Sequence, residues 1–558
     1  MTGFITGTVT EFITGCFERI WIYEEWEKMK KDTSHTLKRA QRFPVILIGE
    51  GLLAGAVSGL IVMLYRIALT FAGQWLNKIL EYINGHPFRI LGWFAVLLLL
   101  AVLVGRLVKW EPMISGSGIP QVEGEVLGKL SQNWKRVLPA KFAGGFLCLL
   151  GGLSLGREGP SIQLGAMGGQ GVSRLLDRGK TEERYLMTCG ASAGLAAAFH
   201  APLAGVMFAL EEIHKGFSVS LLISVMTASV TADYICSHIM GIDPVFQFEL
   251  EHVLPQNYYW MLLILGVILG LLGAFYNKVM LKAQELYKKP KFLNETTRLV
   301  IAFLAAGVLG LLMPSVLGSG GDLIVSLTEG EMILQLVILT FVVKFLFSAV
   351  SFGSGAPGGI FFPLLILGAL IGGAFAMTGV ELFGLDPVYI NNFVLLAMAG
   401  FFTAIVRAPV TGIILLFEMS GSVSQMLSLA VVSVVAYITA TLLKSEPIYE
   451  SLLNRLLDGQ KEENESGENS RRQGAGAGRQ KVLSEFVIMS GSVLEDRTVM
   501  EIHWPNNCLL VALERDGKEM IPRGKTRLMA GDRLTVMTDE RDAGYIHDKL
   551  ENLCYTSF

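Results

Sequence analysis

The stretch Gly156-Arg157-Glu158-Gly159-Pro160 places a charged pair inside a long apolar part of the chain. At membrane depth each such charge costs about 2.5 kcal/mol or more, so the pair should be neutralised by a partner or be functional. The apolar run that follows favours a helix beginning near Glu158. A carboxylate there would occupy a helix N-terminus, where an anion is stabilised, and protonation would release it. The alternative is an Arg157–Glu158 contact with a purely structural purpose; the flanking glycines favour the functional interpretation.

The composition around this stretch indicates a membrane protein. Of 558 residues, 52% are hydrophobic and 17% are charged, against roughly 25% charged residues in soluble chains. The net charge is −3, and no basic stripe with interleaved aromatics suggests nucleic acid. The six scattered cysteines form no C-x-x-C pair, so neither a disulfide framework nor a zinc site is predicted. The N-terminus lacks the pattern of a cleaved signal peptide.

The chain divides into four predicted regions. Residues 1–43 are amphipathic, with a possible interfacial helix over 12–29, and residues 44–458 are a dense series of apolar stretches. Residues 459–480 carry no aliphatic or aromatic side chain larger than alanine and are predicted to be a disordered linker. Residues 481–558 are predicted to form a small soluble α/β domain, with strands at 485–489, 508–514 and 533–538.

Several apolar stretches, among them 185–211, are long enough to cross a bilayer, which takes about 20 residues. Two others are interrupted by Gly and Pro, at 114–170 and 351–363, one in each half of the membrane region. Interrupted segments in corresponding halves favour a transport site, because non-helical backbone at membrane depth must line a cavity or be buried in protein.

Three further motifs carry candidate chemistry. Gly116-Ser117-Gly118-Ile119-Pro120 puts one hydroxyl before a short helix, which suggests an anion site or an ordinary N-cap. Gly358-Gly359-Ile360-Phe361-Phe362-Pro363 could turn the amides of Ile360 and Phe361 toward an ion, or could be a packing kink. Glu211-Glu212 ends an apolar run and is either a solvated helix end or a proton-accepting pair.

These motifs, with Tyr449 in Lys444-Ser445-Glu446-Pro447-Ile448-Tyr449, resemble in order those of the CLC family of chloride channels and chloride/proton exchangers. The resemblance covers about residues 43–458. It implies an all-α polytopic membrane protein with two inverted halves and broken helices, packed as a homodimer with one pore in each subunit.

The resemblance also implies roles for individual residues. The hydroxyls of Ser117 and Tyr449 would coordinate the anion together with the backbone N–H groups of Ile360 and Phe361. Glu158 would be the gate, and Glu212 the internal proton-transfer acid. Many CLC channels have an apolar residue at the position of Glu212, so an acid there favours an exchanger. A serine at 117 is similar to chloride-preferring members, and Lys141 and Arg157 are expected to raise the local positive potential. Phe362 departs from the commoner alanine.

The C-terminal region resembles the TrkA-C (RCK-C) module over about residues 482–550, through Ile521-Pro522-Arg523-Gly524-Lys525-Thr526 and Ala530-Gly531-Asp532-Arg533-Leu534. This implies a small regulatory ligand or a dimerisation role, and a passive assembly role is the alternative.

We therefore predict a chloride/proton antiporter, not an enzyme, in the plasma membrane, with a cytoplasmic C-terminal domain and no cofactor or metal. An uncoupled chloride channel is the alternative. A potassium-linked subunit is disfavoured because no T-V-G-Y-G filter is present, and a membrane-embedded enzyme because no His/Cys/Asp cluster stands out.

Overall fold

The computed structural model divides into two compact units, Met1–Gln460 and Lys461–Phe558, which are described separately. It describes residues 45–241, 252–289, 294–421, 423–471, 481–489, 492–502, 504–505, 508–515, 518–539, 546, 549–550 and 553–554. The helix predicted over 12–29 lies outside these residues.

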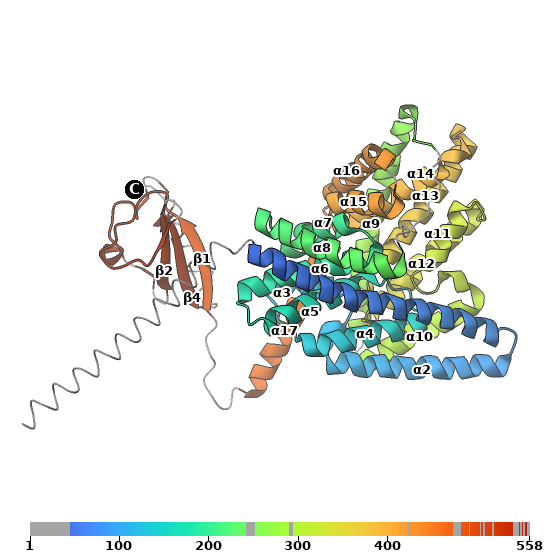
Figure 1. Ribbon diagram of the computed structural model, residues 1–558, viewed down its shortest axis with the longest axis horizontal. Helices are drawn as coiled ribbons and strands as arrows, with labels where there is room; N and C mark the ends of the chain where they lie inside the picture. Colours follow the sequence, from blue (N-terminus) through green and yellow to red (C-terminus); the bar gives the residue numbers. More distant parts are fainter. Residues whose placement is uncertain are drawn as a thin grey trace, which may run out of the picture. The chain divides into compact units, whose positions relative to one another are not determined.

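The first unit is helical throughout (Figure 1). Its first half contains the helix Val45–Ile83, α2 (Pro87–Trp110), α3 (Ile119–Val126), α4 (Trp134–Leu150), α5 (Glu158–Leu175), α6 (Lys180–Phe199), α7 (Pro202–Phe208), the π-helical turn η2 (Ala209–His214) and α8 (Val219–Met240). Its second half contains α9 (Tyr259–Lys288), α10 (Glu295–Leu312), α11 (Gly321–Thr328), α12 (Leu334–Gly353), α13 (Phe361–Phe383), α14 (Ile390–Val406), α15 (Pro409–Ser420), α16 (Met426–Leu442) and α17 (Ile448–Arg471).

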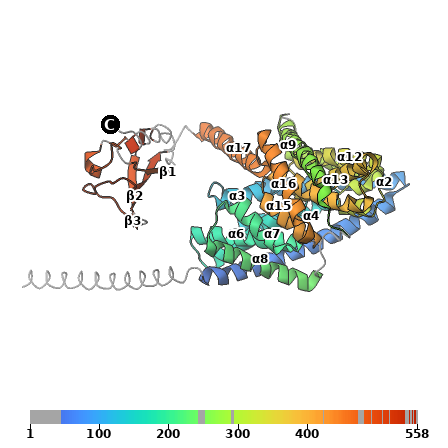
Figure 2. The ribbon, with the colours of Figure 1, turned by 90° about the horizontal axis from the view of Figure 1, so that it is seen from above.

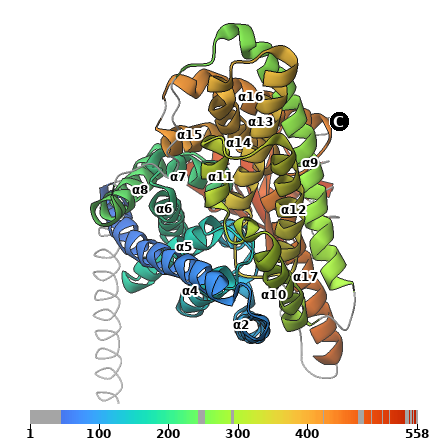
Figure 3. The ribbon, with the colours of Figure 1, turned by 90° about the vertical axis from the view of Figure 1, so that its right-hand side faces the viewer.

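Eight of the described helices are long and apolar enough to cross a membrane, so the chain is a multi-pass membrane protein. Their burial differs: 78% of the most apolar window is buried in α13 and in the span containing α14, against 33% in α2 and α10. The first two therefore lie in the interior, and the last two present apolar faces to the outside. Figure 2 shows α6, α7 and α8 of the first half together and α9, α12 and α13 of the second half together, and Figure 3 shows α10 of the second half beside α2 of the first.

The two halves meet through matching glycines before α5 and α13. The Gly156 N–H donates to the Gly359 carbonyl at 2.7 Å, and the Gly359 N–H donates to the Gly156 carbonyl at 2.8 Å. Equal positions in the two halves thus bond each other reciprocally, as an approximate two-fold relation between them requires.

A buried lysine in each half repeats this relation. Each Nζ donates to two loop carbonyls that are two residues apart, ahead of a short helix. The two sets are Lys141 with Ile114 at 2.8 Å and Gly116 at 2.7 Å, and Lys344 with Val316 at 2.8 Å and Gly318 at 2.9 Å. Both loops continue as Gly-Ser-Gly with positive φ at both glycines, so the loop before α11 is the counterpart of the loop before α3.

The helices α7 and α15 also correspond, because the N-terminus of each is capped by a carboxylate that lies in the other helix or directly after it. Glu418 near the end of α15 accepts from the N–H groups of Leu203 and Ala204 at 2.9 and 2.7 Å. Glu211 in η2 accepts from the N–H and hydroxyl of Thr411 at 3.0 and 2.7 Å. A carboxylate at a helix N-terminus satisfies amides that have no intrahelical partner.

One predicted apolar stretch, 185–211, is not a single span. The structure divides it into α6 and α7, with His200 in the left-handed region at φ 53°. Pro202 causes the break, because a proline disfavours helical conformation in the preceding residue and suits the first turn of a new helix.

The second unit contains an antiparallel sheet in the order β1-β4-β2-β3. Its strands are β1 (Lys481–Val487), β2 (Cys508–Arg515), β3 (Lys518–Met520) and β4 (Arg533–Asp539). The predicted strands match β2 and β4, whereas β1 begins four residues before the predicted 485, and β3 was not predicted. The structure also differs in the predicted linker, since α17 continues as a helix to Arg471; its Glu, Gln and Lys residues are good helix formers.

Candidate anion and proton site

Three helix N-termini meet around Gly159, the second residue of α5. A side chain at this position would clash with Ser117 of the loop before α3, and it would lie 3.2 Å from the Cα of Gly359 before α13. None of these helices has a side-chain cap on its N-terminal amides. The free N–H groups and the positive dipole ends of α3, α5 and α13 therefore point into one region, an arrangement that stabilises an anion.

Two buried hydroxyls lie in this region without a hydrogen-bond partner in the described chain, those of Ser117 and Tyr449. Ser117 is 2% exposed and Tyr449 is fully buried at the start of α17. A buried hydroxyl without a partner is costly, since most buried polar groups are hydrogen-bonded. Both groups are therefore placed to donate to a ligand.

The backbone before and within α13 supplies further donors, enclosed by aromatic rings. Ile360 is the N-cap of α13, and Phe361 is its first residue; both are buried. The Phe361 ring lies 4.9 Å from that of Phe402 and 6.3 Å from that of Phe208, which lies 6.5 Å from the Tyr449 ring. These rings exclude water and join the α13 N-terminus to Tyr449.

The Glu158 carboxylate is fully buried at the start of α5. Neither oxygen accepts a hydrogen bond of normal geometry from the described residues, and the N–H groups of Glu158 and Phe362 are its electrostatic support from the backbone. Its one ion-pair partner in the described chain is Arg157, with Nε 3.9 Å from Oε1. At this distance the carboxylate is held weakly, and it can leave its position without breaking a network.

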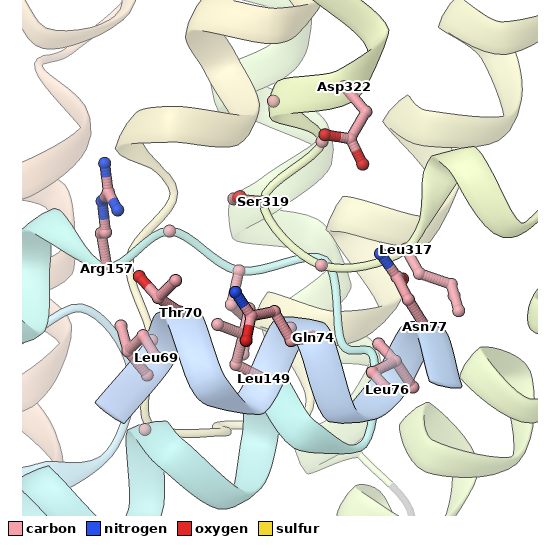
Figure 4. A pocket seen from close by; sticks show the side chains of 18 of the residues that line it. Leu69, Thr70, Gln74, Leu76, Asn77, Leu149, Arg157, Leu317, Ser319 and Asp322 are labelled. Carbon is pink, nitrogen blue, oxygen red and sulfur yellow. The ribbon is translucent and has the colours of Figure 1, made fainter. Parts of the chain in front are cut away.

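Arg157 also lines a cavity of about 370 Å³, which we call the Arg157 cavity (Figure 4). Gln74 and Asn77 of the first helix and Asp322 of α11 contribute polar groups to it. The cavity reaches Gly156, which makes the reciprocal glycine bonds, and Gly358, which precedes their other member, so it opens close to the start of α5.

A second cavity of about 130 Å³, the Ser117 cavity, reaches Ser117 itself. Lys288, Arg298 and Arg455 line it together with the Gly353–Gly355 backbone. Three basic side chains around a small opening raise the local anion concentration.

Glu212 lies in the π-helical turn η2 and is 7% exposed. Lys215 and Glu123 are close enough to interact with it electrostatically, and they pair with each other at 2.7 Å. The charges of Glu158 and Glu212 both reach the Tyr449 hydroxyl. Glu211, by contrast, is occupied by its bonds to Thr411. The two adjacent acids therefore have different environments, and only Glu212 faces the interior of the site.

Comparisons with known proteins show the family of the chain. Residues 98–441 match the voltage gated chloride channel family. The chain is 34% identical over 444 residues to the H(+)/Cl(-) exchange transporter ClcA of Vibrio vulnificus, covering 78% of this chain and 95% of that one. It belongs to the CLC family.

Other CLC proteins support the same placement. The ClcA of Salmonella typhimurium is 32% identical over 77% of this chain and 92% of its own length. A solved structure of a slow cyanobacterial Cl-/H+ antiporter matches with a TM-score of 0.71 and 31% identity, over 74% of this chain and 99% of the other. Residues 483–550 match the TrkA-C domain.

The structure brings together Ser117, Glu158, Ile360, Phe361 and Tyr449 around the three helix ends, and places Glu212 toward Tyr449. Lys141 stands behind the loop rather than in the open site, because both of its hydrogen bonds go to loop carbonyls. Sequence reasoning missed Lys344 and the ion pair of Lys215 with Glu123. A second lysine that follows a second Gly-Ser-Gly, as Lys141 follows the first, was the available signal for Lys344; the Lys215 pair had none.

Proposed function

We propose that this CLC protein exchanges chloride for protons across the membrane. The observation that carries the proposal is the meeting of two unpartnered buried hydroxyls, Ser117 and Tyr449, with a weakly held carboxylate at three uncapped helix N-termini. An anion and the Glu158 carboxylate would have the same partners there, so they compete for one region.

In this proposal chloride enters through the Ser117 cavity and binds between the Ser117 and Tyr449 hydroxyls and the N–H groups of Ile360 and Phe361. The carboxylate of Glu158 blocks the path toward the Arg157 cavity when it is ionised. Protonation removes its charge and its affinity for the helix ends, so it leaves the path and chloride passes. Arg157 stabilises the ionised state, and Lys141 holds the Ser117 loop in place.

Protons take a partly separate route. Glu212 exchanges protons with the side that faces η2, and it passes them toward Glu158 past Tyr449. Its burial next to Lys215 and Glu123 supports this role, because an acid among other charges can bind and release a proton as its neighbours change. The named relatives, which are H(+)/Cl(-) exchange transporters, support coupling over an uncoupled channel.

The proposal extends to the setting of the protein. We place it in the plasma membrane as a homodimer with one pathway in each subunit, with the TrkA-C domain in the cytoplasm as a regulatory unit for a small ligand. The transport cycle described above uses only side chains and backbone groups of this chain, so it involves no enzymatic step and no cofactor.

Parallel flux measurements test the proposal. Purified protein in liposomes with an imposed chloride gradient should drive protons uphill, and the zero-current potential should depend on both gradients. A chloride flux whose reversal potential ignores the pH gradient would refute exchange and leave the uncoupled channel.

A further inference from the structure

A buried acid outside the proposed pathway lies near the C-terminal end of α3. Glu125 is 9% exposed and has no ion-pair partner among the residues that the structure describes. One carboxylate oxygen accepts from Gln170 Nε2 at 2.6 Å, and the other has no hydrogen-bond partner of normal geometry in the described chain. Gln132 lies against the same carboxylate through its backbone N–H and its side-chain amide.

The charged groups around Glu125 do not neutralise it. Glu183 of α6 shares the Gln170 amide at 3.0 Å, but Glu183 is paired with Arg174 at 2.9 Å. Arg184 lies against Gly128, in the turn after α3. A buried carboxylate without a cation is strongly disfavoured unless it takes up a proton. Of the two acids in this network, Glu125 is therefore the one placed to be protonated.

An open cavity of about 560 Å³, the Gln132 cavity, reaches the two glutamines that lie against Glu125. It is lined by Gln132, Gln170, Arg174 and Lys135, and it shares no lining residue with the Arg157 or Ser117 cavities. Lys135 is therefore the further charged group on this side, from the first turn of α4.

From the cavity the network continues inward to the anion site. Gln163 Nε2 donates to Gln132 Oε1 at 2.7 Å and to the Met113 carbonyl at 2.9 Å. The Gln163 side chain packs on Gly118, next to Ser117, so closely that a side chain at 118 would clash with it. Several buried polar atoms along this line have no hydrogen-bond partner of normal geometry among the described residues: Glu125 Oε2, Gln132 Nε2, Gln163 Oε1 and Gln170 Oε1.

We propose that Glu125 is a further proton-binding site, filled from the Gln132 cavity and separate from Glu158 and Glu212. A hydronium ion gives its proton to the free carboxylate oxygen and leaves as water. The neutral acid holds the amides of Gln132 and Gln170 less strongly than the carboxylate does. The change reaches the Ser117 loop through Gln163, so protonation of Glu125 adjusts chloride binding. The second part rests on the proposed function, and the first does not.

Infrared titration of the purified full-length protein tests the first part without any transport. The protonated-carboxyl band of the wild type is followed against pH and compared with that of Glu125→Gln. The matched control is Glu183→Gln, the same isosteric change in the other acid bonded to Gln170, whose charge Arg174 balances. We expect one titrating component to be lost in Glu125→Gln and kept in Glu183→Gln. Equal spectra for wild type and Glu125→Gln would overturn the proposal.

A second variant keeps the test decisive should Glu125→Gln fold poorly. Gln132→Met leaves the acid in place and removes an amide donor that favours the ionised form. The component assigned to Glu125 should then titrate at higher pH, and an unchanged titration would overturn the assignment.

The link to transport has its own readout. Gln163→Met should keep the infrared titration and lose part of the pH dependence of chloride binding. If chloride/proton exchange fails in liposomes while the Glu125 component still titrates, the proposed function is wrong and the proton site stands. If Gln163→Met leaves the pH dependence of chloride binding unchanged, the link to the Ser117 loop is wrong.

Discussion

Glu158→Gln should remove most of the pH dependence of chloride affinity. In the wild type an ionised Glu158 repels a chloride ion in contact with it by about 4 kcal/mol at 4 Å and an effective dielectric constant of 20. If the side chain swings away to about 8 Å, the repulsion falls to about 2 kcal/mol. Chloride affinity should therefore drop by at least about 30-fold between the protonated and the ionised protein. The isosteric amide carries no charge, so this change of about 30-fold should be absent from Glu158→Gln.

Calorimetric titration of chloride into purified protein at several pH values measures this effect. Arg157 attracts chloride whether Glu158 is protonated or ionised. Its 3.9 Å contact with Glu158 therefore does not cancel the difference in chloride affinity between the two states. Wild-type affinity should fall as pH rises, because the carboxylate ionises, and Glu158→Gln should lose most of this slope and keep only the smaller part that Glu125 contributes. A slope in Glu158→Gln as steep as that of the wild type would refute the assignment of Glu158 as the competing anion.

The neighbouring acids serve as controls. Glu212→Gln should keep most of the pH dependence of chloride binding, since Glu158 still has to leave the path, while proton flux in liposomes is lost. Glu211→Gln changes an acid already bonded to Thr411 and should keep coupled transport. Full coupling in Glu212→Gln would show that the internal proton acid is another residue.

Three further outcomes follow from the geometry. Ser117→Ala and Tyr449→Phe should each weaken chloride binding by roughly 10- to 150-fold, because a hydrogen bond to a charged group contributes about 1.5–3 kcal/mol; calorimetry measures this, and an unchanged affinity would contradict the role. Truncation after residue 458 should leave a folded transporter with an altered rate, measured by flux and size-exclusion chromatography, since the buried turns of α17 precede the cut. Arg515→Ala should destabilise the C-terminal unit by about 3–5 kcal/mol, because the buried Asp532 carboxylate would lose its ion pair and two hydrogen bonds of 2.7 and 2.6 Å. Hydrogen exchange in β2 and β4 of the full chain measures the loss of stability.

The sequence predicted where the helices break, but not how the broken ends meet. Glycines and prolines around Ser117, Glu158 and Ile360 identified the breaks, because these residues interrupt helices whatever the tertiary context. The reciprocal bonds of Gly156 and Gly359 join positions some 200 residues apart, and no local pattern specifies such a pair.

Other differences have local physical reasons. Hydropathy gives the length of an apolar run but not the breaks in its backbone. The run 185–211 was therefore predicted as one segment, although Pro202 divides it into α6 and α7. The strand β3 has three residues, too few for alternation to be visible. The sequence predicted a disordered linker after residue 458 because this stretch has no large apolar side chains. A helix can nevertheless extend through such a stretch by its own backbone hydrogen bonds, as α17 does to Arg471.

The two-fold relation gives a physical reason for the position of the proposed anion site. In each half, several helices begin inside the membrane region, which leaves N-terminal amides unpaired there; this is tolerated only where another group satisfies them. Glu418 and Glu211 do this for α7 and α15, each by a carboxylate from the opposite half. The helices α5 and α13 have no such fixed acid, and Glu158 reaches them with one distant ion pair. Since, among the described residues, only the loosely held Glu158 carboxylate occupies the N-terminal amides of α5 and α13, we expect an exchangeable anion to bind these amides when Glu158 moves away.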